Sequence, residues 1–359
     1  MIPYGRQSID EDDIAAVVAV MRSDFLTQGP AVEEFEAALG ATTGARHAVA
    51  FANGTAALHA AVAVAGLGPG DVVATTPLSF AASANCARYV GADVRFVDID
   101  PDTLNLDVSA VPDDIDALVA VHYAGLPVDL TKLSRRPRVV IEDAAHAIGA
   151  LTPDGPVGNC ARSDMTCFSF HPVKTVTTGE GGAVTTNSAD LAGALRRFRH
   201  HGISKSSGSP FWQYDIRELG YNYRLTDMQA ALGTSQLRKL EQFVHRRNEI
   251  AQAYRDAFGI DGRIELPPTA PEGARHAHHL FPILVADRDR VFGELRDRGV
   301  GVQVHYVPTY ELSSFAGHGT AAEFPETDRA FRRCISLPMF PALTDAEQAT
   351  VIDLVREVV

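Results

Sequence analysis

Residues 168–182 read Phe-Ser-Phe-His-Pro-Val-Lys-Thr-Val-Thr-Thr-Gly-Glu-Gly-Gly. They overlap the end of a predicted strand at 165–170, so Lys174 comes just after a buried strand, among proline, threonine and glycine rather than on a charged helix face. Burial disfavours the charged ammonium, and the neutral amine is the form that makes a Schiff base. A lone lysine is usually a surface residue, so this interpretation depends on what surrounds it.

Around this stretch, short apolar runs alternate with helical patterns through the first two-thirds of the chain. The alternation predicts an α/β domain with a mainly parallel sheet flanked by helices. We expect helices at 55–65 and 81–89, and seven strands at 47–51, 72–75, 94–97, 117–121, 139–141, 165–170 and 183–186.

The last third has a different pattern. Apolar residues at helical intervals predict one long helix from 226 to 254. Beyond it we expect a strand at 280–285, a helix at 288–298, a strand at 302–306 and a terminal helix at 345–358, which together indicate a smaller α+β domain. We therefore divide the chain into a large domain at 1–240, with residues 1–14 as an N-terminal arm, and a small domain at 241–359. The serine- and glycine-rich stretch 205–210 predicts a mobile loop.

Composition narrows the class of protein. The net charge of -13 argues against binding to nucleic acid or to a membrane surface. The start of the chain lacks an apolar signal region, and no apolar run is long enough to span a bilayer, so we expect a cytoplasmic protein. Four cysteines without a C-x-x-C pair are expected to be buried and reduced: Cys86, Cys160, Cys167 and Cys334.

Two clusters of basic side chains, one of arginines and one of histidines, do not indicate a binding site. Arg196, Arg197 and Arg199 are interpreted as the solvated face of a helix. The histidines at 276, 278 and 279 precede a strand without nearby carboxylate or cysteine ligands, so we predict no metal site.

Polar residues follow several predicted strands, at the edge where an open parallel sheet binds its ligands. Asn53-Gly54-Thr55 opens a helix after the first strand, and free N–H groups there suit a phosphate; an ordinary N-cap is the alternative. Phe80 follows the second strand and can stack on a planar ring, or it can simply be a core residue.

The strand at 139–141 is followed by Glu142-Asp143-Ala144-Ala145-His146. A carboxylate that leaves a buried strand needs a partner, and the protonated pyridine nitrogen of pyridoxal phosphate (PLP) is a fitting one for Asp143. His146 could then hydrogen-bond the ring hydroxyl. A helix cap and a core histidine are the alternatives. Together with Lys174, these residues lie in the order that one PLP molecule requires.

At this point the chain resembles a known family, the DegT-like sugar aminotransferases of PLP fold type I, which act on nucleotide-linked keto-sugars. The resemblance extends over essentially the whole chain. It is carried by Ile2-Pro3-Tyr4-Gly5-Arg6-Gln7, Leu26-Thr27-Gln28-Gly29-Pro30, Gly54-Thr55-Ala56-Ala57-Leu58, Glu142-Asp143-Ala144-Ala145-His146-Ala147, Gly220-Tyr221-Asn222-Tyr223-Arg224 and Val304-His305-Tyr306.

The resemblance implies a role for individual residues. Lys174 would be the Schiff-base lysine, Asp143 would face the pyridine nitrogen and His146 the ring hydroxyl. Thr55, Ser169 and the backbone of Gly54 and Ala56 would hold the phosphate, Phe80 would stack on the ring, and Asn222 would reach a phosphate across a homodimer interface that contains the active sites. The expected substrate contacts are Tyr4, Arg6, Arg224, His305 and Tyr306.

The resemblance also implies the reaction. L-glutamate would donate an amino group to a nucleotide-linked 4-keto-6-deoxy sugar, and the chain looks most like the branch that aminates UDP-4-keto-6-deoxy-L-AltNAc for pseudaminic acid. Another nucleotide-linked 3- or 4-keto-sugar is the alternative substrate. A sugar dehydratase of this fold has histidine in place of the lysine, which argues against that activity here. A non-catalytic regulator that keeps the fold would be expected to lose Lys174 or Asp143.

Overall fold

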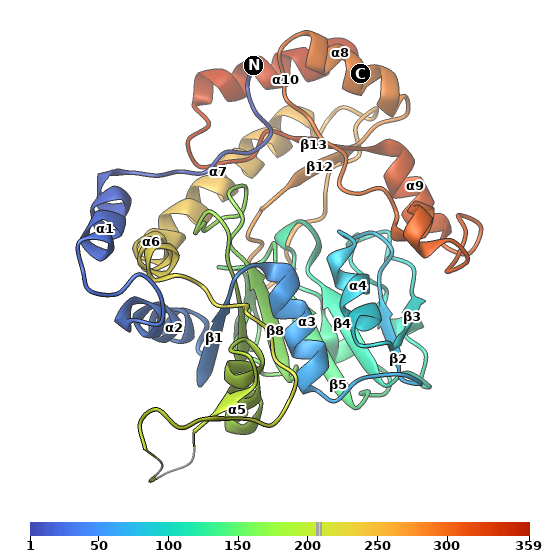
Figure 1. Ribbon diagram of the computed structural model, residues 1–359. Helices are drawn as coiled ribbons and strands as arrows, with labels where there is room; N and C mark the ends of the chain where they lie inside the picture. Colours follow the sequence, from blue (N-terminus) through green and yellow to red (C-terminus); the bar gives the residue numbers. More distant parts are fainter. Residues whose placement is uncertain (206–207, 209) are drawn as a thin grey trace.

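The computed structural model describes residues 1–205, 208 and 210–359. A seven-stranded sheet with the order β1-β9-β8-β5-β4-β2-β3 forms its centre (Figure 1). Its strands are β1 (His47–Phe51), β2 (Val72–Thr75), β3 (Asp93–Phe96), β4 (Ala117–Val121), β5 (Val139–Asp143), β8 (Met165–Ser169) and β9 (Gly182–Thr186). Strand β9 runs opposite to the other six, so its pairings with β1 and β8 are antiparallel and the remaining pairings are parallel. The predicted mainly parallel seven-stranded sheet is confirmed, with strand ends within two residues.

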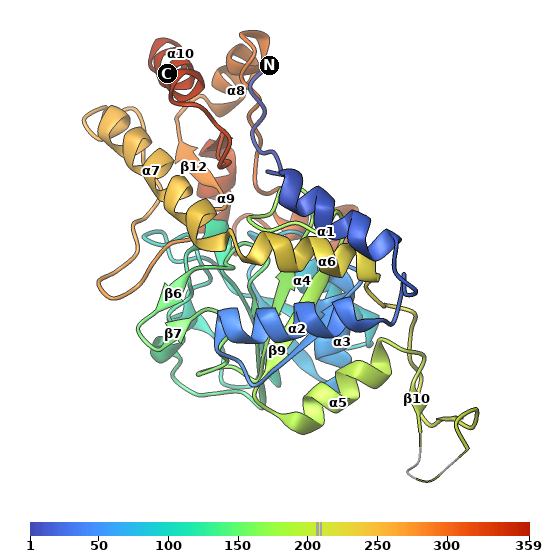
Figure 2. The ribbon, with the colours of Figure 1, turned by 90° about the vertical axis from the view of Figure 1, so that its left-hand side faces the viewer.

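Helices cover both faces of this sheet (Figures 1 and 2). One face packs on α3 (Gly54–Val64), α4 (Ala82–Tyr89) and α5 (Ala189–Phe198). The other packs on α2 (Pro30–Thr43) and α6 (Asp227–Leu237), and α1 (Glu11–Met21) lies against α6. Because both faces are covered, the central strands consist of continuous apolar residues, as in the fully buried β4.

Side chains along β8 alternate between the two faces of the sheet, and this alternation places Ser169 at the site. Phe168 and Phe170 point into the core beneath α2, whereas Cys167 packs in the core on the α3 side. Ser169 shares the side of Cys167, because residues two apart on a strand face the same way. The strand therefore delivers a hydroxyl next to the start of α3, and the chain then turns towards Lys174.

A second core lies above the carboxyl end of the sheet. It contains a two-stranded antiparallel sheet of β12 (Phe281–Leu284) and β13 (Cys334–Leu337), together with α7 (Leu240–Phe258), α8 (Arg288–Asp297) and α10 (Asp345–Val358). Helix α9 (Pro325–Arg333) leads into β13. Helix α7 joins the two cores, because Val244 packs in the first and Ile250 in the second. The boundary that we place between 240 and 241 stays a prediction, and α7 begins at Leu240.

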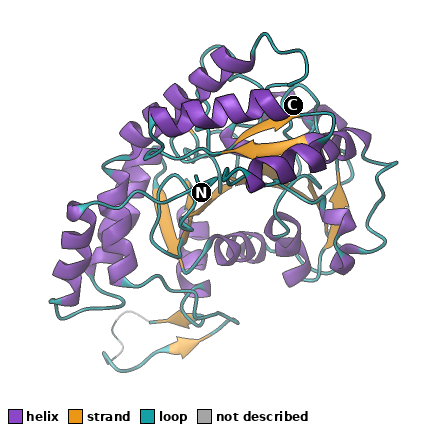
Figure 3. Cartoon of the chain, turned by 90° about the horizontal axis from the view of Figure 1, so that it is seen from above, coloured by secondary structure: helices purple, strands orange, loops and turns teal. Residues whose placement is uncertain are grey.

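The smaller elements connect these layers. Two short hairpins pair β6 (Leu151–Thr152) with β7 (Gly155–Pro156) and β10 (Ile203–Ser204) with β11 (Asp215–Ile216); the second extends away from the body (Figure 3). The 3₁₀ turns are η1 (Val108–Ala110), η2 (Tyr123–Gly125), η3 (Leu130–Lys132), η4 (Thr309–Glu311) and η5 (Ser313–Phe315). The mobile loop predicted at 205–210 includes residues 206, 207 and 209, which lie outside the described residues.

The prediction of one helix from 226 to 254 is wrong, because the chain bends at Arg238 and Lys239 between α6 and α7. Lys239 is held there by Asp10 and Asp13, at 2.6 and 2.7 Å. Apolar residues keep their helical spacing through the bend: Leu237 and Leu240 are buried in the same core. The hydrophobic pattern therefore gave no sign of the change in direction.

The strand predicted at 302–306 is also wrong. Only Gln303 pairs, through an isolated bridge to Ser336. The chain then leaves the sheet, and the carbonyl of His305 accepts a hydrogen bond of 2.6 Å from the Tyr123 hydroxyl of the large domain. The strand that does pair with β12 is β13, which the sequence analysis missed together with α9.

Other sequence-based expectations concern single residues and membrane segments. All four cysteines are buried and unpaired, as predicted. No described helix is both long and apolar enough to cross a membrane.

Candidate active site

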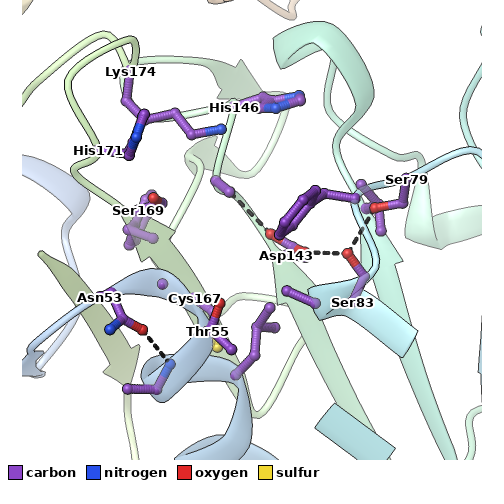
Figure 4. Close-up of a pocket in the computed structure, with 18 of the residues that line it drawn as sticks. Asn53, Thr55, Ser79, Ser83, Asp143, His146, Cys167, Ser169, His171 and Lys174 are labelled. Atoms are coloured by element: carbon purple, nitrogen blue, oxygen red, sulfur yellow. Dashed lines mark hydrogen bonds between the residues drawn. The ribbon is translucent and has the colours of Figure 1, made fainter. Parts of the chain in front are cut away.

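A pocket of about 950 Å³ opens at the carboxyl ends of the central strands, where the second core approaches the sheet. Its walls come from the start of α3, the loop between β2 and α4, the ends of β5 and β8, and the segment 305–306. Figure 4 shows that the side chains of Thr55, Asp143, Ser169 and Lys174, although distant in sequence, surround one space.

Lys174 lies on a loop that is closed upon the end of β8. The Phe170 carbonyl accepts hydrogen bonds from the backbone N–H and hydroxyl groups of neighbouring threonines, 2.9 Å from Thr178 and 3.0 Å from Thr177. The lysine side chain extends into the pocket beside His146 (Figure 4). Burial of the amine lowers the pKa of Lys174 from 10.5 to about 8, against the opposing effect of the Asp143 charge. A substantial fraction of this amine is therefore neutral near physiological pH.

Asp143 is the last residue of β5 and is buried at the pocket wall. Its Oδ2 accepts a hydrogen bond of 2.7 Å from the Ser83 hydroxyl, and its Oδ1 accepts one of 3.1 Å from the Ala145 N–H. Each carboxylate oxygen has two acceptor sites, so the group can still accept a donor from the pocket.

The start of α3 forms a narrow cradle. A Cβ added to Gly54 would lie only 2.8 Å from Cβ of Ser169, so only glycine allows helix and strand to approach this closely. The hydroxyl residues Thr55 and Ser169 line the pocket beside it. Asn53 Oδ1 accepts the Ala56 N–H at 2.8 Å, which is an ordinary N-cap. Asn53 is therefore an N-cap, and the helix start presents its positive end to the pocket.

His146 lies at the opposite wall, in contact with the second core. Its Nε2 is 3.0 Å from the hydroxyl oxygen of Tyr306, and its ring lies 4.3 Å from that of His279, measured between centroids. Burial and the neighbouring charges of Lys174 and His305 hold the pKa of His146 well below its usual range, so the ring is neutral. Among the described residues, Nδ1 of His146 is buried without a hydrogen-bond partner.

Comparisons with known proteins agree with this geometry. Residues 7–356 match the model of the DegT/DnrJ/EryC1/StrS aminotransferase family. The chain belongs to this family. It is therefore an aminotransferase, and its cofactor is pyridoxal phosphate.

Individual relatives of this aminotransferase cover nearly its whole length. UDP-4-amino-4,6-dideoxy-N-acetyl-beta-L-altrosamine transaminase of Campylobacter jejuni is 36% identical, over 94% of this chain and 92% of the relative. UDP-4-amino-4-deoxy-L-arabinose--oxoglutarate aminotransferase of Shewanella sediminis is 33% identical, over 100% and 98%. Among solved structures, the putative sugar aminotransferase Spr1654 from Streptococcus pneumoniae in its PMP form has a TM-score of 0.93, with 28% identity over 100% of this chain and 99% of that one.

The pocket of this aminotransferase fits the cofactor on three observations of its own. Lys174 supplies an amine whose pKa is low enough for Schiff-base chemistry. Gly54 leaves at the helix start a cradle that a side chain would fill. The unpartnered Nδ1 of His146 is a buried polar atom that needs a hydrogen-bonding group, and the ring hydroxyl of the cofactor can provide one.

The remaining candidates are divided between the pocket and the surface. Tyr4, His305 and Tyr306 line the pocket, as does the largely exposed Phe80. Arg6 and Arg224 do not line the pocket of their own chain. Arg6 is exposed, and Nη1 of Arg224 lies 2.9 Å from Nδ1 of His200. Asn222 is exposed outside the pocket, although its neighbours on both sides line it. Their expected roles stay predictions.

Sequence reasoning missed several residues of the site. Ser83, in the first turn of α4, donates to Asp143, and Ser79, in the loop before α4, contacts Ser83. His279 packs against His146. The serines lie in or just after the stretch that suggested Phe80, but nothing in their spacing indicates a carboxylate partner. The histidine was considered only as a metal ligand.

Proposed function

We propose that this aminotransferase moves an amino group from L-glutamate to a nucleotide-linked 4-keto-6-deoxy sugar, with UDP-4-keto-6-deoxy-L-AltNAc as its substrate. The observation that carries the proposal is a single pocket with a lysine amine of lowered pKa and a buried carboxylate in its walls. At about 950 Å³, the pocket is near the upper end of the range for small-molecule sites, which suits a cofactor together with a large substrate.

The names of two relatives support the choice of substrates. The Campylobacter jejuni relative is named for a UDP-linked amino-dideoxy sugar, and the Shewanella sediminis relative for oxoglutarate, the product that glutamate leaves behind. Both named sugars carry the amino group at C4. Another nucleotide-linked keto-sugar is the second candidate, since these relatives differ in their sugars at similar identity.

The residues of the pocket can carry out the proton movements of the reaction. When bound, PLP holds the substrate nitrogen covalently and withdraws electrons from the adjacent carbon. In our proposal, Nζ of Lys174 removes the proton from that carbon as general base and, as general acid, delivers it to the cofactor carbon bonded to the same nitrogen. Asp143 accepts a hydrogen bond from the protonated ring nitrogen, and His146 forms a hydrogen bond with the ring hydroxyl through Nδ1. The keto-sugar receives the amino group by the same steps in reverse, so the kinetics are ping-pong.

The proposal includes a homodimer in which Asn222 of one subunit reaches the cofactor phosphate in the other. Its support is the position of Asn222, which is exposed although Tyr221 and Tyr223 line the pocket of their own chain. An exposed amide beside one pocket wall is available to a second copy related by twofold symmetry.

A single-turnover experiment tests the substrate. The pyridoxamine-phosphate form is mixed with UDP-, GDP- and dTDP-linked 3-keto and 4-keto sugars, and the visible absorbance of lysine-bound cofactor is followed, with Lys174→Ala as control. We expect the absorbance to return with a UDP-4-keto-6-deoxy-HexNAc. Its return only with a different sugar would select the second candidate. No return with any keto-sugar, while oxoglutarate still reacts, would refute a sugar substrate.

A mixed dimer tests the role of Asn222. Lys174→Ala and Asn222→Ala are each expected to be nearly inactive, so the two are unfolded together and refolded at equal amounts. If Asn222 acts on the neighbouring site, each mixed dimer has one intact site, and about a quarter of the wild-type activity should return. A monomer in sedimentation, or no recovery on mixing, would contradict the proposal.

A further inference from the structure

Strand β5 ends in two buried carboxylates, Glu142 and Asp143, which differ in their hydrogen-bond partners. Glu142 accepts hydrogen bonds from Ser163 and Thr166, and its Oε2 lies 2.8 Å from Nε2 of His122. These contacts lower the pKa of Glu142 although burial acts in the opposite direction. Glu142 is thus satisfied within the protein. Asp143, the next residue, faces the pocket with fewer partners.

Asp143 receives two donors, one on each oxygen. The Ser83 hydroxyl donates to Oδ2 at 2.7 Å, and the Ala145 N–H donates to Oδ1 at 3.1 Å. Contacts on both oxygens fix the plane of the carboxylate, while acceptor sites remain for a donor in the pocket. The main chain supplies one of these contacts. The other depends on a single side chain.

The direction of the hydroxyl hydrogens follows from the chemistry of the groups. The Ser83 hydroxyl donates to Asp143, and a hydroxyl has only one hydrogen to donate. Ser83 Oγ lies 2.7 Å from Ser79 Oγ, and it can only accept from that hydroxyl. Ser79 therefore donates to Ser83, and Ser83 donates to Asp143. Dashed lines mark both contacts in Figure 4. All three side chains are at most 5% exposed.

Ser83 belongs to the first turn of α4, and the loop before it, which holds Ser79, is itself anchored. The Pro77 carbonyl accepts hydrogen bonds from the backbone N–H and the hydroxyl of Thr309, at 2.9 and 3.1 Å. Thr309 is fully buried and belongs to the segment after Tyr306. Hydroxyl dipoles that are fixed before a ligand binds stabilise a negative charge without any cost of reorganisation.

We propose that Ser83 is a positioning residue for the cofactor, which acts through Asp143 on the proton of the pyridine nitrogen, and that Ser79 fixes the direction of the Ser83 hydroxyl. The inference rests on the proposed placement of the ring nitrogen at Asp143. It assigns a role to two serines that are otherwise only part of the pocket wall. The two hydroxyls hold the carboxylate in the plane that receives the ring N–H.

The test compares two ligands that differ only at the ring nitrogen. Pyridoxamine phosphate and its 1-deaza analogue, in which a C–H replaces the nitrogen, bind the apoprotein without a covalent bond, and their dissociation constants are measured by calorimetry. Wild type should prefer pyridoxamine phosphate. Ser83→Ala should reduce this preference about tenfold, the size expected for a hydrogen bond to a charged group. Ser83→Thr, which keeps the hydroxyl, should restore it.

Two further variants make the result decisive. Ser163→Ala removes a similar hydroxyl from Glu142 in the same strand, and it should leave the preference unchanged. Ser79→Ala should give an intermediate loss, and it decides the question if Ser83→Ala does not fold. An equal weakening of both ligands by the serine variants would overturn the proposal and leave a purely structural role. If wild type binds both ligands equally, the ring nitrogen does not face Asp143, and the proposed placement fails first.

Discussion

The rate at which apoprotein captures PLP should rise with pH and level off with a midpoint near pH 8. Only neutral Lys174 can attack the aldehyde, and burial lowers the pKa of Lys174 from 10.5 to about 8. At pH 7 this shift raises the neutral fraction by about 300-fold, from roughly 0.03% to roughly 9%. At pH 7, Lys174 in the folded pocket should therefore react hundreds of times faster than a surface lysine with a pKa of 10.5.

Stopped-flow absorbance measures this directly. Apoprotein is mixed with the cofactor between pH 6 and 10.5, and Nα-acetyl-lysine is run in parallel to correct for the ionisation of the cofactor itself. Asp143→Asn is the informative variant: the Asp143 charge raises the pKa of Lys174, so its removal should move the midpoint to lower pH. A corrected rate that keeps rising to pH 10 without a plateau would refute the reasoning.

Two further substitutions test the packing that supports the site. Gly54→Ala places a methyl group 2.8 Å from Cβ of Ser169, so overpacking of about 1–3 kcal/mol should weaken the binding of pyridoxamine phosphate roughly 5- to 160-fold. Gly293→Ala, in a helix with open space, is the control, and equal behaviour of the two variants would contradict this account. Phe170→Ala removes a fully buried ring that packs edge-on against Phe35, with 5.3 Å between the ring centroids. The free energy of unfolding in urea should fall by about 3–5 kcal/mol. A fall below about 1 kcal/mol would show that the core refills the space.

Sequence-based predictions of strands were more accurate in the first two-thirds of the chain than in the last third. Strands such as β1 and β4 were predicted with the ends that they have, because each is a short apolar run between turn residues and lies buried in the sheet. In the last third, the pattern at 302–306 was compatible with a strand, but the segment instead supplies His305 and Tyr306 to the pocket. Its partner contacts come from Tyr123 and His146, far away in sequence.

The site shows the same division. The order of residues along the chain was enough to bring Thr55, Asp143 and Lys174 to one edge, because parallel strands all end on the same side of the sheet. The sequence by itself therefore determined the sheet, the family resemblance and the position of Lys174 at the edge of the sheet. Only the tertiary structure decided which hydroxyls orient Asp143, that His279 packs on His146, and that Arg6 and Arg224 lie outside their own pocket. Those facts depend on loop paths and contacts between the two cores, and such long-range contacts leave no periodic trace in the sequence.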